Sequence, residues 1–201
     1  MNRVLLATHN AAKLAELRRI LRSSAPGVEV VGLDDVPPYA EPAETEPTFE
    51  GNALIKARAA VVATGLPSLA DDSGLCVDEL HGMPGVLSAR WSGVDKDDRR
   101  NNELLLAQLR DVPAERRGAD FQCAVAFCRP GGAEDVTFGV MRGRIIGEMR
   151  GSNGFGYDVL FVPDGHDRTS AEMSSEEKDR LSHRGQALLA VVPILVKDLA
   201  T

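Results

Sequence analysis

Four consecutive residues, Asp71-Asp72-Ser73-Gly74, combine two carboxylates, a hydroxyl group and a glycine, a set suited to metal-assisted chemistry. One apolar run precedes them and another follows at residues 75–77, so we expect the carboxylates at the end of a strand and a turn at Ser73-Gly74. Mg²⁺ takes oxygen ligands and is usually held by one or two carboxylates together with substrate phosphates. The same residue types are common in solvated turns, so this stretch taken alone favours a turn.

A second candidate site follows the apolar run at residues 3–8, which is typical of a buried parallel strand. Asn10 suits a helix N-cap, and leucines then recur at helical spacing up to residue 23. The connection at residues 8–13 is therefore a strand-to-helix turn, where free N–H groups, the helix dipole and the Lys13 cation favour anion binding. An ordinary β–α connection has the same pattern, and the segment is neither a P-loop nor a dinucleotide-binding fingerprint.

Residues 49–64 are predicted to form a helix with a polar stripe, because Thr48 suits the N-cap and Gly65 the C-terminal end. Phe49, Asn52 and Lys56 lie at positions i, i+3 and i+7, and therefore on one face. An aromatic ring, an amide and a lysine are unusual for a core face and for a solvent face. They suit the wall of a polar pocket, with chance spacing as the alternative.

The other segments are predicted to be a binding loop and scaffold. The loop at residues 34–47 is long for a connection inside a domain, and Glu44 is its candidate metal ligand, whereas Glu41 and Glu46 are interpreted as solvated acids. Ser174 and Glu177 match a capping box. Further predicted elements are a helix at 98–109, strands at 28–33, 120–127, 136–141, 144–149 and 159–162, a glycine-rich loop at 151–156, and a last helix after residue 184 that is kinked at Pro193.

The composition limits the function classes. The chain has 201 residues, 43% of them hydrophobic, and fits one domain or a domain with a lobe. Its net charge of −7 argues against nucleic-acid binding, which depends on phosphate neutralisation by lysine and arginine. Cys76, Cys123 and Cys128 lack zinc-type spacing and are typical of buried residues in a reducing compartment. Without a signal-peptide pattern or an apolar run near the ~18 residues of a membrane span, we expect a cytoplasmic protein with no membrane partner.

Six motifs occur in order along the chain. They are T-H-N-x-x-K at 8–13, T-F-x-x-N-A-x-x-K at 48–56, L-A-D-D-S-G-L at 69–75, G-x-P-G-x-x-S-A-R-W-S-G at 82–93, F-G-Y-D at 155–158 and E-K-x-x-x-S-H-R-G at 177–185. Each motif alone is a weak signal. Together, from residue 4 to about residue 195, they resemble the inosine triphosphate pyrophosphatase family of non-standard purine nucleotide pyrophosphatases.

The resemblance implies both a fold and an activity. The expected fold is α/β, with a long central mixed β-sheet flanked by helices, in two lobes with the active-site cleft between them, and residues 1–201 forming one domain. The expected reaction converts ITP, dITP and XTP to the monophosphate and pyrophosphate with Mg²⁺, in a homodimer. Neither a nucleic acid nor a membrane is an expected partner.

Carried over to this sequence, the resemblance also implies a role for each motif. Asp72 is expected to be the general base and a metal ligand, Lys56 to act beside it in catalysis, and Glu44 and Asp71 to hold or position the metal. Turn 8–13 is expected at the phosphates, and the residues from 155 onward at the nucleoside end. The expected substrate contacts are Thr8, His9, Asn10, Lys13, Asn52, Ser73, Phe155, Gly156, Tyr157, Asp158, Lys178, His183 and Arg184.

Two positions depart from the family pattern. Val159 stands where a proline usually follows F-G-Y-D, which removes a rigid neighbour of Asp158. Ala43 replaces an acid that some members carry beside Glu44, which leaves one carboxylate at that position.

The residue types also indicate how the reaction can proceed. Cleavage between the α and β phosphates requires an in-line water, a proton acceptor and cations at the phosphate oxygens. An aspartate of ordinary pKa, ~3.9, is a weak base, so we expect an alkaline optimum. Donors from His183 or Arg184 near the purine O6 can reject the adenine amine. Two alternatives stay open: a purine nucleotide sensor without turnover, and a pyrophosphatase for modified pyrimidine nucleotides.

Overall fold

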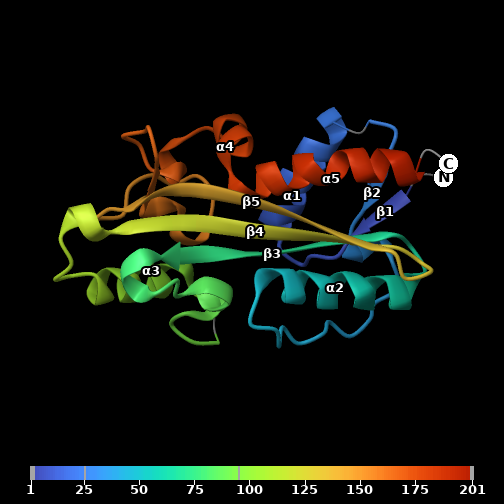
Figure 1. The fold of residues 1–201 in the computed structure, drawn as a ribbon, viewed down its shortest axis with the longest axis horizontal. Helices are drawn as coiled ribbons and strands as arrows, with labels where there is room; N and C mark the ends of the chain where they lie inside the picture. The colour runs from blue at the N-terminus through green and yellow to red at the C-terminus, as the bar shows by residue number, and fades with distance from the viewer. Residues whose placement is uncertain (1–2, 25, 95, 200–201) are drawn as a thin grey trace. The chain divides into compact units, whose positions relative to one another are not determined.

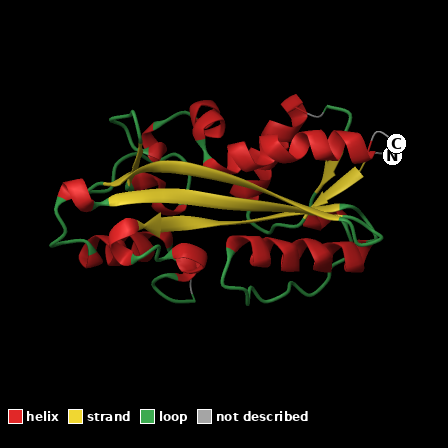
Figure 2. Ribbon diagram, viewed as in Figure 1, coloured by secondary structure: helices red, strands yellow, loops and turns green. Residues whose placement is uncertain are grey.

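The structure, a computed structural model, describes residues 3–24, 26–94 and 96–199. Six strands are hydrogen-bonded in the order β2-β1-β3-β4-β5-β6 (Figures 1 and 2). The sheet is mixed, because β1 (Arg3–Leu6) runs parallel to β2 (Glu29–Val31) and β3 (Ser68–Val77), whereas β6 (Phe161–Pro163) is antiparallel to β5 (Glu134–Ile145). The fourth strand is β4 (Gly118–Cys128). The predicted α/β class with a mixed sheet is confirmed.

The chain divides into two compact units. The first contains the chain up to residue 72, residues 123–139 and the chain from residue 184 onward, and the second contains residues 73–122 and 140–183. The helices of the chain are α1 (Ala11–Ser24), α2 (Phe49–Thr64), α3 (Asp98–Gln108), α4 (Ser175–Leu181) and α5 (His183–Leu199). Short 3-10 helices are η1 (Leu33–Asp35), η2 (Asp78–Leu80), η3 (Gly85–Arg90), η4 (Ala114–Arg116), η5 (Gly156–Val159) and η6 (Ser170–Glu172).

In the first unit, helices cover both faces of the sheet. Val4 and Leu6 of β1 pack with residues of α1 and α5, whereas Leu5 and Ala7 pack with alanines of α2. Figure 1 shows α1 and α5 on one side of the strands and α2 on the other. Because side chains alternate along a strand and both faces are buried, β1 reads as a continuous apolar run. The alanines of α2 let the helix approach the sheet closely.

In the second unit, one core joins the strands to α3 and η5. Its fully buried members include Leu75 of β3, Leu105 of α3 and Leu160 after η5. Tyr157 of η5 belongs to the same core, and its hydroxyl donates a 2.9 Å hydrogen bond to the carbonyl of Ser88. The loop that carries the F-G-Y-D motif is thus packed into this core through its tyrosine.

Several predicted elements are observed with their end signals. The helix at 49–64 has the predicted bounds, with the Thr48 hydroxyl accepting the Gly51 N–H at 3.1 Å and Gly65 in the left-handed conformation at φ 67°. The Ser174–Glu177 capping box is present, with reciprocal bonds of 3.2 and 2.8 Å. Pro193 lies inside α5. No helix among the described residues is long and apolar enough to cross a membrane.

One predicted turn is wrong, and three predicted strands have different bounds in the structure. The turn at Ser73-Gly74 does not occur, because β3 continues from Ser68 to Val77 and is buried along most of its length. The strand predicted at 136–141 and the start of the one predicted at 144–149 belong to one strand, β5, in which Gly143 pairs with Pro163, whereas residues 146–149 lie beyond its end. The strand predicted at 159–162 is observed only in its second half, because η5 extends to Val159 and β6 begins at Phe161. At Ser73-Gly74 and at Gly143, sheet pairing overrode the local turn preference.

Candidate active site

The turn between β1 and α1 is built by its own polar side chains. The Thr8 hydroxyl accepts the Asn10 backbone N–H at 3.2 Å, and the side-chain oxygen Oδ1 of Asn10 accepts the Lys13 backbone N–H at 3.1 Å. Asn10 therefore caps α1, as its type predicts. The cap directs the first turn of the helix so that Lys13 Nζ reaches Asp71 Oδ2 at 2.8 Å.

Asp71 is the centre of a buried charge network in the first unit. Its Oδ2 accepts hydrogen bonds from Lys13 and, at 3.2 Å, from Arg184 Nε. Arg184 is itself 2% exposed and donates from Nη1 to Glu16 Oε2 at 2.7 Å. Arg184 thus binds the carboxylates of both Asp71 and Glu16, and Lys13 is a second cation bound to Asp71. Removing any one of these charges would leave a buried partner uncompensated.

The charges around Asp71 fix its ionisation. Burial alone favours the neutral acid, but the cations of Lys13 and Arg184 outweigh that effect and hold the pKa of Asp71 well below its usual range. Burial likewise disfavours the Arg184 cation, and Asp71 and Glu16 outweigh it, so the pKa of Arg184 is raised. Asp71 is thus an anion at every physiological pH and is unsuited to accept a proton.

Asp72 has a different set of partners in the same unit. Its Oδ1 accepts a 3.1 Å hydrogen bond from Lys56 Nζ, which also donates to Glu44 Oε1 at 2.9 Å. The Asn52 amide lies 3.4 Å from Asp72 Oδ2. The amide oxygen and nitrogen of Asn52 also bind the backbone of Glu46, at 2.9 and 3.1 Å, so Asn52 fixes the end of the loop that carries Glu44.

The pKa of Asp72 is shifted in the opposite direction. Burial raises the pKa of this carboxyl, and the charge of Glu44 adds to the increase; Lys56 and Lys13 counteract it without reversing it. Burial lowers the pKa of Lys56, but the surrounding carboxylates of Asp72, Asp71 and Glu44 outweigh burial and raise it. Lys56 therefore stays a cation, whereas Asp72 is a stronger base than an ordinary aspartate.

Strand alternation explains why neighbouring carboxylates differ. Leu69 packs on the side of α1 and α5, and Ala70 on the side of α2. Asp71 and Asp72 continue this alternation, so Asp71 meets Lys13 and Arg184 while Asp72 meets Lys56 and Asn52. The pairing of β1 with β3 ends at Leu6 and Leu69, so both acids lie beyond the carboxyl end of β1. Ligand sites of open α/β sheets form at this edge.

The donor set for a divalent cation is partly assembled. Glu44 and Asp72 both bind one ammonium group, that of Lys56, which shows that their oxygens converge on a single cation. Asp71 Oδ2 is already taken by two cations, whereas its buried Oδ1 has no hydrogen-bond partner among the described residues. Within the described parts of the chain, no group of three or more His, Cys, Asp or Glu side chains is arranged to hold a metal. Glu44 and Asp72 therefore fit a hydrated cation better than a fully protein-ligated one.

The F-G-Y-D loop forms a second cluster, in the second unit. Asp158 Oδ2 accepts hydrogen bonds from the Phe155 N–H at 2.9 Å and from Lys178 Nζ at 2.5 Å. Lys178 Nζ also lies 5.2 Å from the centre of the Phe155 ring. The ring of His183 stacks on Phe121, with centroids 4.9 Å apart and planes at 10°. Asp158, Lys178 and His183 are all buried, so this cluster is preorganised rather than solvated.

Gly154 is required for the ion pair of Asp158 with Lys178. Its φ of +82° lies in the left-handed region, and a Cβ at this position would collide with the Asp158 carboxylate and the Lys178 ammonium group. The sequence analysis placed Gly154 only in a glycine-rich loop, because a glycine's steric role depends on atoms that are distant in sequence.

The structure brings most predicted site residues into these clusters and leaves others apart. Ser73 opens the second unit. His9 is exposed and lies 3.9 Å from Glu41, in the loop before α2. Tyr157 has its hydroxyl in the core, and burial raises its pKa, so it offers no free face to a base. Arg184 was predicted beside the F-G-Y-D residues, and its guanidinium group binds the carboxylates of Asp71 and Glu16 in the first unit.

Glu16 was missed by the sequence analysis. It is a 5% exposed carboxylate on α1, where only its spacing of three residues from Lys13 hinted at a shared face. Asp98 and Asn102 of α3 were missed as well, since their segment was interpreted as scaffold. Their contacts become apparent from hydrogen bonds to a loop more than fifty residues away.

Comparison with known proteins gives consistent matches. The sequence profile of the Ham1 family matches residues 4–194. A dITP/XTP pyrophosphatase of Nocardia farcinica is 61% identical, covering 97% of this chain and 95% of that protein, and one of Cutibacterium acnes is 56% identical, covering 99% and 98%. The crystal structure of a nucleoside-triphosphatase, dITP/XTP pyrophosphatase, from Mycobacterium abscessus is 57% identical with a TM-score of 0.78, covering 95% of this chain and 99% of that chain. The Staphylococcus aureus Ham1 protein is 35% identical with a TM-score of 0.87, covering 98% and 99%.

Proposed function

The chain belongs to the Ham1 family, and we propose that it hydrolyses non-standard purine nucleoside triphosphates such as dITP, ITP and XTP to the monophosphate and pyrophosphate. Its relatives of more than half identity carry the name dITP/XTP pyrophosphatase over nearly their whole length. The observation that carries the mechanism is the pair of adjacent aspartates with opposed surroundings. Asp71 is a fixed anion that binds two cations, and Asp72 is a buried carboxylate whose pKa is raised.

Asp72 is the proposed proton acceptor. Its Oδ1 is held by Lys56 and its Oδ2 lies near the Asn52 amide, so both oxygens have fixed positions. The attacking water transfers its proton to Asp72 as its oxygen attacks the α phosphorus, and pyrophosphate leaves. The raised pKa brings Asp72 closer to the operating pH, where general-base catalysis is most effective.

Lys13 and the start of α1 are the proposed phosphate site. The helix N-terminus favours anions through its dipole and free N–H groups. Asp71, which is itself bound by Arg184, holds the Lys13 ammonium group in place from the buried side. A phosphate oxygen therefore meets a lysine that has already lost much of its side-chain freedom, which lowers the entropic cost of binding.

Mg²⁺ is the proposed cofactor, with Glu44 and Asp72 as its protein ligands. When bound, Mg²⁺ neutralises charge on the phosphate oxygens and favours departure of pyrophosphate. Lys56, which bridges the same two carboxylates, keeps them in position and supplies positive charge beside the reacting phosphate. Asp71 is proposed to help position the metal through its buried Oδ1, because its Oδ2 is taken by Lys13 and Arg184.

The second unit supplies the proposed nucleoside contacts. Phe155 offers a ring face for the purine, and base–aromatic stacking contributes about 1–3 kcal/mol. The Asp158–Lys178 pair lies beside this ring, and the buried His183, stacked on Phe121, is a further polar group of the same unit. Donors aimed at the purine O6 would disfavour adenine, whose amine leaves them unpaired.

The remaining expectations concern the assembled protein in the cell. We propose one pyrophosphatase domain made of the two units, acting as a homodimer in the cytoplasm on the free nucleotide pool. Light scattering combined with gel filtration tests the dimer, with twice the chain mass of 21.6 kDa as the expected value. A monomer at all concentrations would contradict it.

A substrate panel tests the proposed activity. Pyrophosphate release is measured with dITP, ITP, XTP, ATP and dUTP at equal concentration, with Mg²⁺, for the wild type and Asp72→Asn. We expect turnover of the first three, little turnover of ATP and dUTP, and a loss of about 10²–10⁴ in kcat for Asp72→Asn. Asp111→Asn, which changes an exposed residue paired with Arg110, is the matched control and should behave as wild type. Tight binding of dITP without pyrophosphate release would contradict the proposal.

A further inference from the structure

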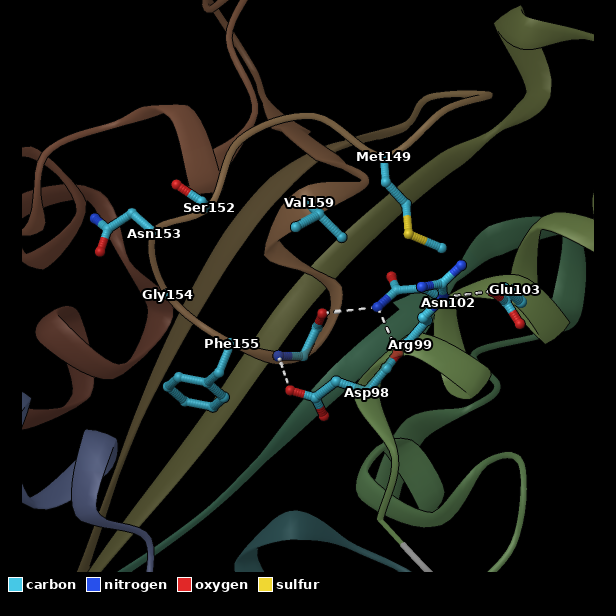
Figure 3. A pocket seen from close by; sticks show the side chains of 11 residues that line it. Asp98, Arg99, Asn102, Glu103, Met149, Ser152, Asn153, Gly154, Phe155 and Val159 are labelled. Carbon is cyan, nitrogen blue, oxygen red and sulfur yellow. Dashed lines mark hydrogen bonds and ion pairs between the residues drawn. The ribbon is translucent and has the colours of Figure 1, made fainter.

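Both backbone polar groups of Gly156 are bound by side chains of α3. The Gly156 N–H donates to Asp98 Oδ2 at 2.6 Å, and the Asn102 amide donates to the Gly156 carbonyl at 2.9 Å. Asp98 and Asn102 are one turn apart on the helix, so they face the same way. Figure 3 shows both side chains extending from the helix toward the loop that carries Phe155.

We call the two hydrogen bonds from Asp98 and Asn102 to Gly156 the clamp, and it holds a residue of the loop that has no side chain to pack. A pocket of about 400 Å³ lies beside it, lined by Asp98 and Asn102 of α3 and by loop residues that include Met149, Ser152 and Phe155 (Figure 3). Gly156 has a positive φ of 62° and no side chain, so it gains no packing of its own. Tyr157 anchors the following residue in the core, so the two hydrogen bonds from α3 are what hold Gly156 itself on the side that faces the open space.

The clamped residue lies next to the proposed stacking ring. Phe155 directly precedes Gly156, and its ring is directed away from Asp98 and Asn102 in Figure 3. On the Phe155 side the loop is tied by the bond from the Phe155 N–H to Asp158. The peptide is thus fixed from both sides, which sets the direction of the ring.

We infer that Asp98 and Asn102 are positioning residues for the nucleoside end of the substrate, acting through Gly156 on the Phe155 ring. This inference rests on the proposed function. Neither residue belongs to the proposed phosphate or metal site. Loss of the clamp therefore weakens binding of the base and leaves the rate of the bound complex largely unchanged.

The same helix offers matched controls at the preceding positions. Asp97 caps α3 by accepting the Arg100 N–H at 3.0 Å. Asn101 is 2% exposed, as is Asn102, and it also binds two backbone groups, those of Ser92 and Ala89, at 2.7 and 3.2 Å. Changes at 97 and 101 therefore cost comparable helix and loop contacts without touching Gly156.

Steady-state kinetics with dITP test the inference on four variants, Asn102→Asp, Asn101→Asp, Asp98→Ala and Asp97→Ala, with Asp98→Asn as the conservative fifth. Asn102→Asp keeps the side-chain shape but places an oxygen against the Gly156 carbonyl, so we expect KM to rise about tenfold or more with kcat within about threefold. Asp98→Ala should raise KM by a smaller factor, because its bond is exposed to solvent. Asn101→Asp and Asp97→Ala should leave KM within about twofold, and Asp98→Asn, which retains an acceptor, should restore most of the loss.

The inference would be overturned if the changes at 101 and 97 raised KM as much as those at 102 and 98. A fall in kcat without a rise in KM for the 98 and 102 variants would also overturn it. Hydrogen exchange of the amides in residues 153–160 provides a readout without substrate, and it should accelerate in the 98 and 102 variants but not in the 97 and 101 variants. Unchanged exchange in all four would also overturn it. Failure of the proposed function is seen separately, as absence of dITP turnover in the wild type.

Discussion

Asp71 and Asp72 are adjacent in the chain, yet their carboxyl groups have pKa values shifted in opposite directions. Strand alternation places Asp71 against Lys13 and Arg184 and places Asp72 against Lys56 and Asn52. Asp71 thereby stabilises the fold and holds the proposed phosphate-binding residue Lys13, whereas Asp72 is placed for proton transfer. The two roles can be separated by substituting each residue in turn.

Asp71→Asn is expected to destabilise the fold. It leaves the buried Arg184 and the Lys13 cation with one counter-charge fewer, and breaking a buried ion pair on one side costs about 3–5 kcal/mol. Urea unfolding at pH 7 measures the change in the free energy of unfolding. Asp111→Asn removes a fully exposed ion pair and should change it by no more than about 1 kcal/mol. Equal stabilities of the two variants would contradict the role given to Asp71.

The stability of the wild type should depend on pH through the same residue. The folded pKa of Asp71 lies below its ordinary value of ~3.9, so its stabilising contribution is complete above that pH and is lost as the pH falls toward the folded pKa. Asp71→Asn should lack this part of the acid dependence. Parallel curves of unfolding free energy against pH between 5 and 2 for both proteins would contradict the assignment.

Much of this arrangement can be read from the sequence, and the missing parts have physical causes. Lys56 and Asn52 were placed on one face of a helix by their spacing alone, and the structure puts both beside Asp72. The sequence did not reveal that Asp71 and Asp72 lie on opposite faces of a strand, because the residues D-D-S-G have the composition of a turn. Had the strand been taken as continuous, alternation with Leu69 and Ala70 would have revealed it. Glu16 and Gly154 act through tertiary contacts that leave no local pattern.

Gly154→Ala is expected to weaken substrate binding. The new methyl group would displace Asp158 or Lys178, and the left-handed backbone adds strain, so KM for dITP should rise at least about tenfold, or about 1.4 kcal/mol. Gly27→Ala is the matched control, because no atom of the described residues lies within 4 Å of its added Cβ and its φ is not positive. It should leave KM unchanged. A wild-type KM for Gly154→Ala would mean that the Asp158–Lys178 pair does not contact the substrate.

Glu44→Gln is expected to weaken metal activation. Losing one of the two proposed ligands should raise the Mg²⁺ concentration for half-maximal activity about tenfold or more, a loss of about 1.4 kcal/mol. EDTA should abolish wild-type activity, and added Mg²⁺ should restore it. Glu46→Gln, an exposed acid two residues away, is the control and should keep the wild-type dependence. An unchanged Mg²⁺ titration for Glu44→Gln would remove Glu44 from the metal site.

The pH dependence of kcat/KM for dITP, measured for the wild type and Asp72→Asn, tests the central claim most directly. The wild type should lose activity on the acid side as Asp72 takes up a proton, with an apparent pKa above the ordinary ~3.9. Asp72→Asn should lose about 10²–10⁴ in kcat and the acid limb with it. Its stability at pH 7 should be retained, since burial already disfavours the charged form of Asp72. Wild-type turnover in Asp72→Asn, or an unchanged acid limb, would contradict the assignment of Asp72 as the base.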